Sequence, residues 1–190
     1  MQELIIRKGR PLTKEMRSPY EMDCYDLLDS LGIEYHRIDH EPADSMELCR
    51  EIDKVLGTEM CKNLFLANRQ MTDFYLLMTV GDKPFKTKYL SSQLGVSRLS
   101  FAKDDKMWEY LKIHPGAVSV MGLMNDTEKH VKLIVDSDIM KQEYIGCHPC
   151  VSTTSMRIKA NDIFEKFLSH TGHSVTVVDL PNEEEEISQL

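Results

Sequence analysis

Two cysteines and two histidines are the first residues in the sequence whose types and spacing could do chemistry. Cys147 and Cys150 form a C-x-x-C motif, and His170 and His173 follow it. Such a motif serves as a redox pair or as half of a zinc site. A redox pair needs its first cysteine at a helix N-terminus, but the strand-like run 151–155 follows this one. We therefore favour two half-buried cysteines that flank a turn, with a zinc site as the alternative.

Signatures of several common hydrolases are missing from the sequence. There is no G-x-S-x-G nucleophile elbow, because Ser119 is spaced wrongly for one. Neither a Walker A motif nor a G-x-G-x-x-G phosphate loop occurs, and no cluster of carboxylates and histidines indicates a catalytic metal. We expect no cofactor and no metal.

Polar residues at the ends of apolar runs remain as candidates. Lys62 precedes the run 63–67, and the small, apolar segment 116–122 begins and ends with glycine. His148 precedes a proline at the mouth of a predicted strand, and His40 precedes a predicted helix. Each also has an ordinary structural interpretation: a solvated edge lysine, a tight strand entry, a packed histidine and a turn.

Helices and strands must alternate to position these residues. The pattern of caps and apolar spacing predicts helices over 18–31, 45–57, 87–94, 104–111 and 161–170. Alternating or β-branched runs predict strands over 33–38, 63–67, 74–80, 98–101, 118–120, 131–135, 151–155 and 175–178. Several adjacent strands in the second half lack an intervening helix, so we expect an α/β fold with a mixed, barrel-like sheet flanked by helices.

Composition sets the class of protein. The chain has 190 residues and 21.9 kDa, with 42% hydrophobic and 28% charged residues, which is typical of one globular domain. No apolar run approaches the ~20 residues of a membrane-spanning helix, and the N-terminus lacks a signal-peptide core. Five cysteines, an odd number, fit a reducing compartment. We expect a soluble, cytoplasmic protein.

Charge is distributed unevenly. The net charge is −8, and Glu183–Glu186 contribute four negative charges to what we expect to be a solvated acidic tail over 181–190. Residues 1–17 instead hold five basic side chains against two acidic ones. They predict a basic N-terminal extension, either solvated or in contact with phosphate, ahead of a domain over 18–180.

Six short segments, in one order along the chain, carry a resemblance to a known family. They are His40-x-Pro42-Ala43 with Ser45, Lys62–Leu66, Leu94-Gly95 with Leu99–Ala102, Pro115–Ser119, Gly122-Leu123, and His148-Pro149-x-x-Ser152-Thr153. Together they resemble the YbaK / prolyl-tRNA-synthetase-associated editing domains, specifically the freestanding ProX-type members. The resemblance spans about residues 18–180.

This resemblance implies an activity. The family hydrolyses the ester that joins a wrong amino acid, most often alanine, to the 3′-terminal ribose of tRNA for proline. It implies tRNA, through its acceptor end, as the partner, with prolyl-tRNA synthetase as a candidate second partner. The alternative is a non-catalytic module that senses an aminoacyl group or an amino acid in the same pocket.

The resemblance also assigns roles to residues. The family's lysine falls on Lys62 and its histidine on His148, which become the predicted catalytic pair. Substrate contacts are predicted from His40, Ser45, Asn63, Gly116, Ala117, Val118, Ser119, Val120, Gly122 and Ser152. Contacts with tRNA phosphates are predicted from Arg7, Lys8, Arg10, Lys83, Lys86 and Lys88.

Two positions depart from the family pattern. Val120 stands where the family's recognition loop has proline, which would fix the backbone angle φ. Ser152 stands where the family has asparagine, so a hydroxyl replaces a longer carboxamide. The identity of the cleaved amino acid is therefore less firmly implied than the reaction.

Overall fold

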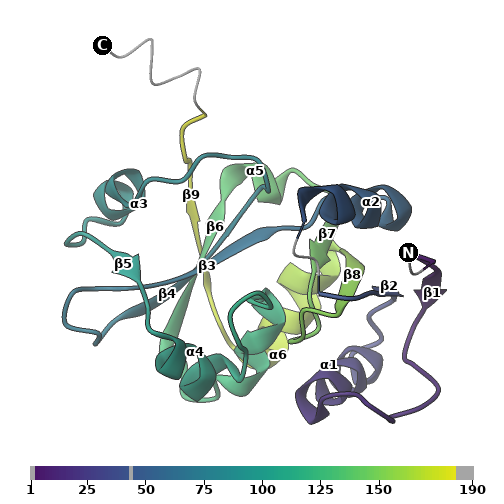
Figure 1. The fold of residues 1–190 in the computed structure, drawn as a ribbon. Coiled ribbons are helices and arrows are strands. Elements are labelled where there is room, and N and C mark those ends of the chain that lie inside the picture. Colours follow the sequence, from purple (N-terminus) through teal and green to yellow (C-terminus); the bar gives the residue numbers. More distant parts are fainter. Residues whose placement is uncertain (1–2, 43–44, 183–190) are drawn as a thin grey trace.

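The computed structural model describes residues 3–42 and 45–182 and contains two β-sheets with helices packed around them (Figure 1). Ala43 of the first family segment, Asp44 and the acidic stretch 183–186 lie outside the described residues. Within the described ranges, no helix combines the length and apolar composition that crossing a membrane requires.

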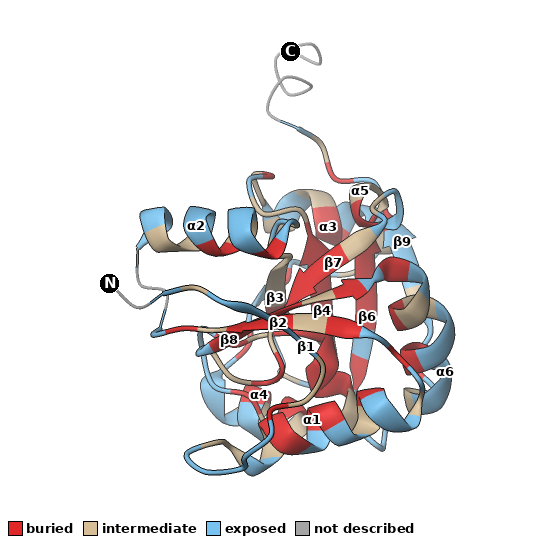
Figure 2. Ribbon diagram, turned by 90° about the vertical axis from the view of Figure 1, so that its right-hand side faces the viewer, coloured by how far each residue is buried: buried red, intermediate tan, exposed pale blue. Residues whose placement is uncertain are grey.

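The first sheet is antiparallel and has the strand order β1-β2-β8-β7. Its strands are β1 (Ile6–Lys8), β2 (Tyr35–Asp39), β8 (Thr154–Lys159) and β7 (Tyr144–Cys147). Helix α1 (Pro19–Ser30) covers one face, where the ring of Tyr25 stacks on Tyr35. Helix α2 (Met46–Leu56) covers the other face, so this sheet lies between two helices (Figure 2).

The second sheet is mixed and has the order β5-β3-β4-β6-β9. Its strands are β5 (Ser100–Phe101), β3 (Lys62–Ala67), β4 (Phe74–Thr79), β6 (Val131–Asp136) and β9 (Val175–Val178). Strands β4, β6 and β9 run parallel, whereas β3 pairs antiparallel with β4 and β5. Every residue of β4 is buried, as expected for a strand covered on both faces.

Two apolar clusters hold these layers together. The larger one joins both sheets and α1, with Phe65, Met78 and Met156 among its buried members. The smaller one lies between the second sheet and α3 (Thr87–Leu94), through Leu66, Leu77 and Leu90. Short segments complete the chain: α4 (Asp104–Leu111), the 3₁₀ helix η1 (Val120–Asn125), α5 (Ser137–Met140), the π-helix η2 (Asp162–Phe167) and α6 (Leu168–Thr171).

The α/β class, the mixed sheet and the flanking helices are confirmed, but the sheets do not close into a barrel. Strands β1 and β7 remain the edges of one sheet, and β5 and β9 those of the other. The sheets meet at an isolated bridge between Met60 and Gly146, where the N–H of Cys61 donates to the carbonyl of Gly146 at 2.8 Å. The backbones approach so closely there that a Cβ at Gly146 would lie 2.5 Å from the carbonyl oxygen of Glu59.

Most predicted elements are found within two residues, including α3 and α4 at their predicted ends. The strand predicted over 118–120 is wrong, because the chain turns there into η1. The strand predicted over 151–155 begins only at Thr154, after Cys150 has taken a left-handed φ of 62°. Strand β7 was not predicted, and the cap predicted at Asn161 makes no side-chain hydrogen bond.

Candidate active site

A cavity of about 320 Å³ lies between α2 and the end of the first sheet. It brings together three residues that the sequence singled out, namely Gly116, His148 and Ser152. The other residues that line it are Pro42, Cys49, Ile52, Met60, Pro115 and Ser155. Three family segments that are far apart in the sequence thus meet around one hollow.

His148 lines this cavity, and one of its two ring nitrogens is held by a hydrogen bond. Its Nδ1 lies 2.8 Å from the carbonyl oxygen of Thr154, which can only accept a hydrogen bond, so Nδ1–H donates. The other ring nitrogen, Nε2, then carries the lone pair. Burial lowers the pKa of His148 below its ordinary value, although the hydrogen bond to Thr154 opposes this effect, so the neutral ring predominates at neutral pH.

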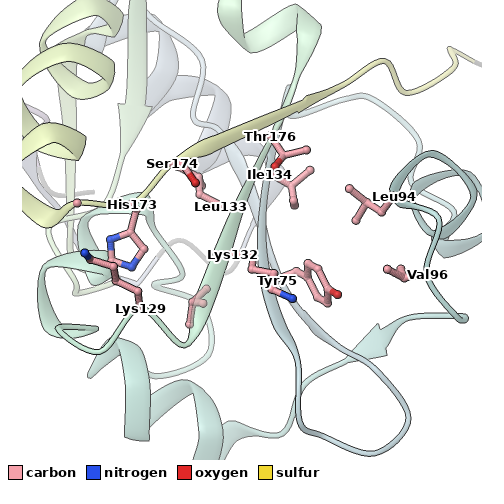
Figure 3. A pocket seen from close by; sticks show the side chains of 12 residues that line it. Tyr75, Leu94, Val96, Lys129, Lys132, Leu133, Ile134, His173, Ser174 and Thr176 are labelled. Carbon is pink, nitrogen blue, oxygen red and sulfur yellow. The ribbon is translucent and has the colours of Figure 1, made fainter.

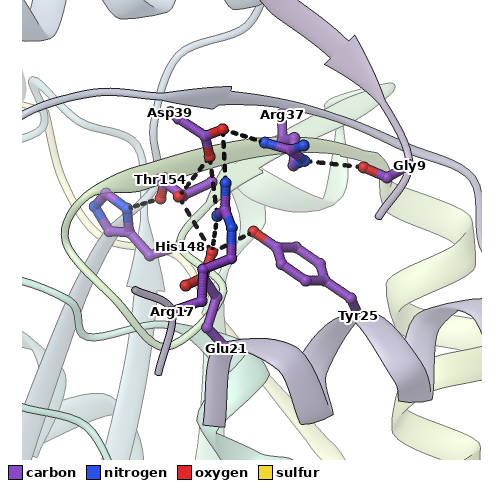
Figure 4. A network of polar contacts seen from close by, with 8 residues as sticks. All are labelled: Gly9, Arg17, Glu21, Tyr25, Arg37, Asp39, His148 and Thr154. Atoms are coloured by element: carbon purple, nitrogen blue, oxygen red, sulfur yellow. Dashed lines mark hydrogen bonds and ion pairs between the residues drawn. The ribbon is translucent and has the colours of Figure 1, made fainter. Parts of the chain in front are cut away.

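A network of charged residues fixes the start of β8, where the carbonyl of Thr154 accepts the hydrogen bond from His148 (Figure 4). The hydroxyl of Thr154 donates to Asp39 at 3.1 Å, and Arg17 binds the same carboxylate at 2.8 Å. Arg37 also contacts Asp39, and Glu21 contacts Arg17. Burial alone would raise the pKa of Asp39, but its hydrogen bonds to the two arginines, and their charges, lower it to about 2. The carboxylate therefore stays ionised and Thr154 stays in place.

His40 supports the cavity from behind. It is 5% exposed, its Nδ1–H donates to the carbonyl of Glu41 at 2.7 Å, and its Nε2 accepts from the hydroxyl of Ser155 at 2.9 Å. Because Ser155 itself lines the cavity, His40 orients a hydroxyl there. We predicted a substrate contact from His40, and the structure places it one residue behind the cavity wall.

The glycine-rich loop divides into an open part and a buried part. Gly116 has a φ of +89° and no atom within 4 Å of where a Cβ would lie, so its backbone is bare toward the cavity. Ala117 and Val118 pack against the larger core, although Ala117 also reaches a neighbouring groove.

The inner half of this loop has buried side chains, so any substrate contact predicted there would have to come from its backbone. The side chains of Ser119 and Val120 are fully buried, and the Ser119 hydroxyl accepts from the N–H of Met121 at 3.2 Å to cap η1. Gly122 is needed for packing, because a Cβ there would lie 2.6 Å from Cδ1 of Ile113. In this structure these three residues shape the loop from inside.

Lys62 points elsewhere. Its Nζ donates to the carbonyl of Lys83 at 2.5 Å, and strand alternation places it on the sheet face of Leu64 and Leu66, toward α3. Burial lowers the pKa of Lys62, although Asp82 opposes this effect. Among the described residues that line the cavity Lys62 is not found.

Two other predicted contacts have local roles. The hydroxyl of Ser45 accepts from the N–H of Leu48 at 3.2 Å and caps α2. The amide nitrogen of Asn63 donates to the carbonyl of Cys61 at 3.1 Å, and its buried Oδ1 has no hydrogen-bond partner among the described residues.

The predicted tRNA-binding cations do not form one surface. Lys83 is 4% exposed and is bound to Asp136 and Asp138 at 2.9 and 2.8 Å, so it cannot meet a phosphate; burial of this ion pair corrects that prediction. Lys88 and Lys86 lie on and just before α3, at one end of the molecule. The remaining three, Arg7, Lys8 and Arg10, lie on or beside β1 at the opposite end (Figure 1).

The C-x-x-C motif and His173 take part in separate contacts, and His170 is exposed. Cys147 and Cys150 are buried thiols, and hydrogen bonding to Cys150 together with burial raises the pKa of Cys24. His173 lies 3.2 Å from Asp126. Within the described ranges no three His, Cys, Asp or Glu side chains gather as a metal site would require.

A larger hollow, of about 480 Å³, lies on the second sheet and contains none of the predicted site residues (Figure 3). Tyr75, Lys129, Lys132 and His173 line it, and Lys132 is bound to Asp73 at 2.8 Å. Size alone therefore does not identify the site; the convergence of family segments does.

Sequence reasoning missed several residues that support the site. Thr154 and Ser155 lie in a predicted strand without a predicted role, Arg17 was predicted only as part of the basic extension, and Asp39 had no predicted role. The sequence feature that could have indicated Thr154 and Ser155 is the alternation of side chains along β8, because Thr154 faces the charged network and Ser155 faces the cavity. That alternation becomes informative only when the strand boundaries and register are known.

Comparison with known proteins agrees with this geometry. Residues 40–166 match the family model of the aminoacyl-tRNA editing domain. The chain is 30% identical to the prolyl-tRNA editing protein ProX of Acetoanaerobium sticklandii, over 80% of this chain and 93% of that protein. It is 28% identical to the prolyl-tRNA synthetase associated domain-containing protein 1 of Danio rerio, over 80% of this chain and 83% of that protein.

A solved structure shows the same fold. It is described as the "Crystal structure of a putative trans-editing enzyme for prolyl tRNA synthetase", and it superposes with a TM-score of 0.64 at 15% identity, over 86% of this chain and 99% of that one. The family model, the ProX relative and the shared fold lead to one conclusion. The chain belongs to the aminoacyl-tRNA editing domain family.

Proposed function

We propose that this chain is a trans-editing hydrolase that deacylates mischarged aminoacyl-tRNA, with alanine on tRNA for proline as its main substrate. The observation that carries the proposal is the cavity in which neutral His148 and the bare backbone of Gly116 meet, in a chain of this family. We propose the cytoplasm as its location, because tRNA is charged there, and prolyl-tRNA synthetase as a candidate partner.

The chemistry needs little beyond this geometry, because an aminoacyl ester is already reactive. Nε2 of His148 accepts a proton from a water as the water oxygen bonds to the ester carbonyl carbon. Main-chain groups of the Gly116 turn stabilise the negative charge that develops on the carbonyl oxygen. The bond from that carbon to the ribose oxygen then breaks, and the proton passes from His148 to the ribose oxygen. The products are the free amino acid and intact tRNA.

Selectivity is proposed to follow from size. A synthetase built for proline cannot strongly reject smaller alanine, because each lost methylene forfeits only ~1–3 kcal/mol. A second cavity that admits alanine and excludes proline removes the error. The cavity here is bounded by Ile52, Met60 and Pro115, and Ser152 stands in its wall where the family has asparagine.

Lys62 keeps its predicted role as a residue that holds the substrate end, which would require its side chain to turn away from the α3 face of the sheet. Its ammonium must leave the carbonyl of Lys83 to reach the cavity. Lys62→Ala is expected to lower deacylation while leaving the fold intact. Lower thermal stability with unchanged kcat/KM would instead assign Lys62 to anchoring the loop that contains Lys83.

A deacylation panel tests the proposal. Alanine, serine, cysteine and proline are each esterified to the same tRNA, and release of the amino acid is followed with wild type and with His148→Asn. We expect fast release of alanine, slow release of proline and loss of activity in the variant. Absence of turnover with every ester, together with stabilisation of the protein by one of them, would favour the non-catalytic sensing module.

A further inference from the structure

A second groove, of about 470 Å³, adjoins the cavity and has a different character. It runs between the start of α1 and the end of α4, and it is lined by aromatic rings, hydroxyls and one lysine, together with prolines and small apolar residues. Pro115 and Ser152 belong to the walls of both hollows, and Gly116 and Ala117 are neighbours that face one hollow each. A ligand longer than an amino acid can therefore extend from the cavity into the groove.

The groove contains a stack of flat side chains. The ring of Trp108 lies 4.6 Å from that of His114 at an interplanar angle of 15°, and Tyr20 meets Trp108 edge-on at 5.3 Å. Trp108 is 37% exposed although it is a large apolar residue, and His114 is exposed. The stack thus presents accessible aromatic surface inside a hollow.

Lysine and hydroxyl groups surround this stack. Nζ of Lys112 lies 5.9 Å from the centre of the Trp108 ring, and Ser18, Ser152 and Thr153 line the same groove. Aromatic rings that stack on bases, next to a cation that meets phosphate, are the means by which proteins hold single-stranded nucleic acid. An apolar protein segment would have no use for the cation and the hydroxyls.

We infer that this groove holds the unpaired 3′-terminal nucleotides of tRNA, with a base stacked against an open side of the Trp108–His114 pair and a backbone phosphate near Lys112. The inference rests on the proposed function, because it needs the aminoacyl group in the adjoining cavity. It locates the acceptor end between α1 and α4 and makes Trp108 a binding residue, whereas the cations predicted from the sequence lie elsewhere on the molecule.

Fluorescence tests the inference without any turnover. Trp108 is the single tryptophan of the chain, so its emission reports on this groove alone. We expect an RNA hairpin that has a single-stranded CCA end and no attached amino acid to quench the emission in a saturable manner. The same hairpin with abasic nucleotides in place of CCA is the control and is expected to bind weakly. Equal effects of both hairpins, or no quenching, would overturn the inference.

Kinetics provides the second measurement. Trp108→Ala is expected to raise KM for aminoacyl-tRNA about 5- to 150-fold, which is the effect of losing one base-stacking contact. Trp108→Phe keeps an aromatic ring and is expected to bring KM back close to the wild-type value. Hydrolysis of alanine methyl ester, which lacks a nucleotide, should be unchanged in both variants. Phe101→Ala removes a 62% exposed ring outside the groove and is the matched control.

The measurements distinguish failure of the proposed deacylase activity from failure of the proposed RNA groove. Quenching by the CCA hairpin without deacylation of any ester would refute the enzyme and keep the RNA groove. Deacylation with the same KM in wild type and Trp108→Ala would keep the enzyme and refute the groove. Equal loss of activity toward tRNA and toward the methyl ester would show that Trp108 acts on the fold, and would also refute the groove.

Discussion

His148 concentrates the proposed chemistry in one atom, Nε2, because Nδ1–H is committed to the carbonyl of Thr154. Only the neutral ring can accept a proton, and burial lowers the pKa of His148 below its ordinary value of 6.5. We therefore expect kcat/KM to stay level at neutral pH and to fall on acidification through a pKa below 6.5. A pH–rate profile of alanine release measures this.

His148→Asn separates the base from its support, because the asparagine amide can still donate to Thr154 but offers no Nε2. Its kcat should drop about 100-fold or more, its melting temperature should stay close to that of wild type, and the acidic limb of its profile should vanish. An unchanged rate in this variant would remove His148 from the mechanism.

The sequence could predict individual site residues through the ordered family segments, and it could not predict where their side chains point. Gly116, His148 and Ser152 do share one cavity. Lys62 shows the limit: strand alternation sends its side chain to the other face of the sheet, toward the carbonyl of Lys83. The supporting role of Asp39 depends on its pairing opposite Thr154, which only the strand register reveals.

At the scale of elements, helices that end at a capping residue such as glycine could be predicted from the sequence. Segments whose conformation is determined by tertiary packing could not. Gly95, which ends α3 with a φ of 63°, fixed that boundary in advance. The run 118–120 has two β-branched valines and predicts a strand, yet Ser119 caps a 3₁₀ helix there. Local propensity lost to tertiary packing, because η1 must fit against the end of α4.

Gly122 tests that packing argument. A Cβ at this position would lie 2.6 Å from Cδ1 of Ile113 and 3.0 Å from Cβ of Leu111, and Ile113 is fully buried. Gly122→Ala is expected to reduce the free energy of unfolding by about 1–3 kcal/mol, measured by urea denaturation.

Ile113→Val removes the clashing Cδ1 and supplies the internal control for Gly122→Ala. Alone it should cost about 0.5–1.5 kcal/mol. Combined with Gly122→Ala it should cost less than the sum of the two single changes, because the valine leaves room for the new methyl group. Strict additivity would mean that Gly122 is not required by this contact.

At the scale of the whole molecule, the N-terminal arm is more integrated than its composition suggested. We predicted a basic extension over residues 1–17, whereas β1 within it pairs with β2 and Arg17 binds Glu21 and Asp39. The arm therefore closes over the back of the site, because Asp39 also holds Thr154. The sequence pattern did not indicate the pairing of β1 with β2, because the three residues of β1 are all exposed and therefore show no alternation of buried and exposed side chains.

This integration predicts how stability depends on acid. The pKa of Asp39 is about 2 in the folded protein and ordinarily 3.8, so between these values the unfolded chain binds more protons than the folded one. The stabilisation is fully present above about pH 4 and is lost as the pH falls through 2. It amounts to at most about 2 kcal/mol, because one pKa unit corresponds to about 1.4 kcal/mol and Asp39 is one-third exposed.

Arg17→Met should remove much of this effect by leaving Asp39 with Arg37 alone. We expect a lower urea midpoint at pH 6, a shallower decline between pH 4 and pH 2, and slower deacylation, because Thr154 and with it His148 lose their anchor. Arg10→Met is the matched control for the stability measurements alone, because Arg10 is itself a predicted tRNA contact: it pairs with Asp26 near the surface, where such a pair contributes under about 1 kcal/mol. If Arg17→Met showed the acid dependence and the deacylation rate of wild type, the contact between the arm and Asp39 would support neither the stability of the fold nor the active site.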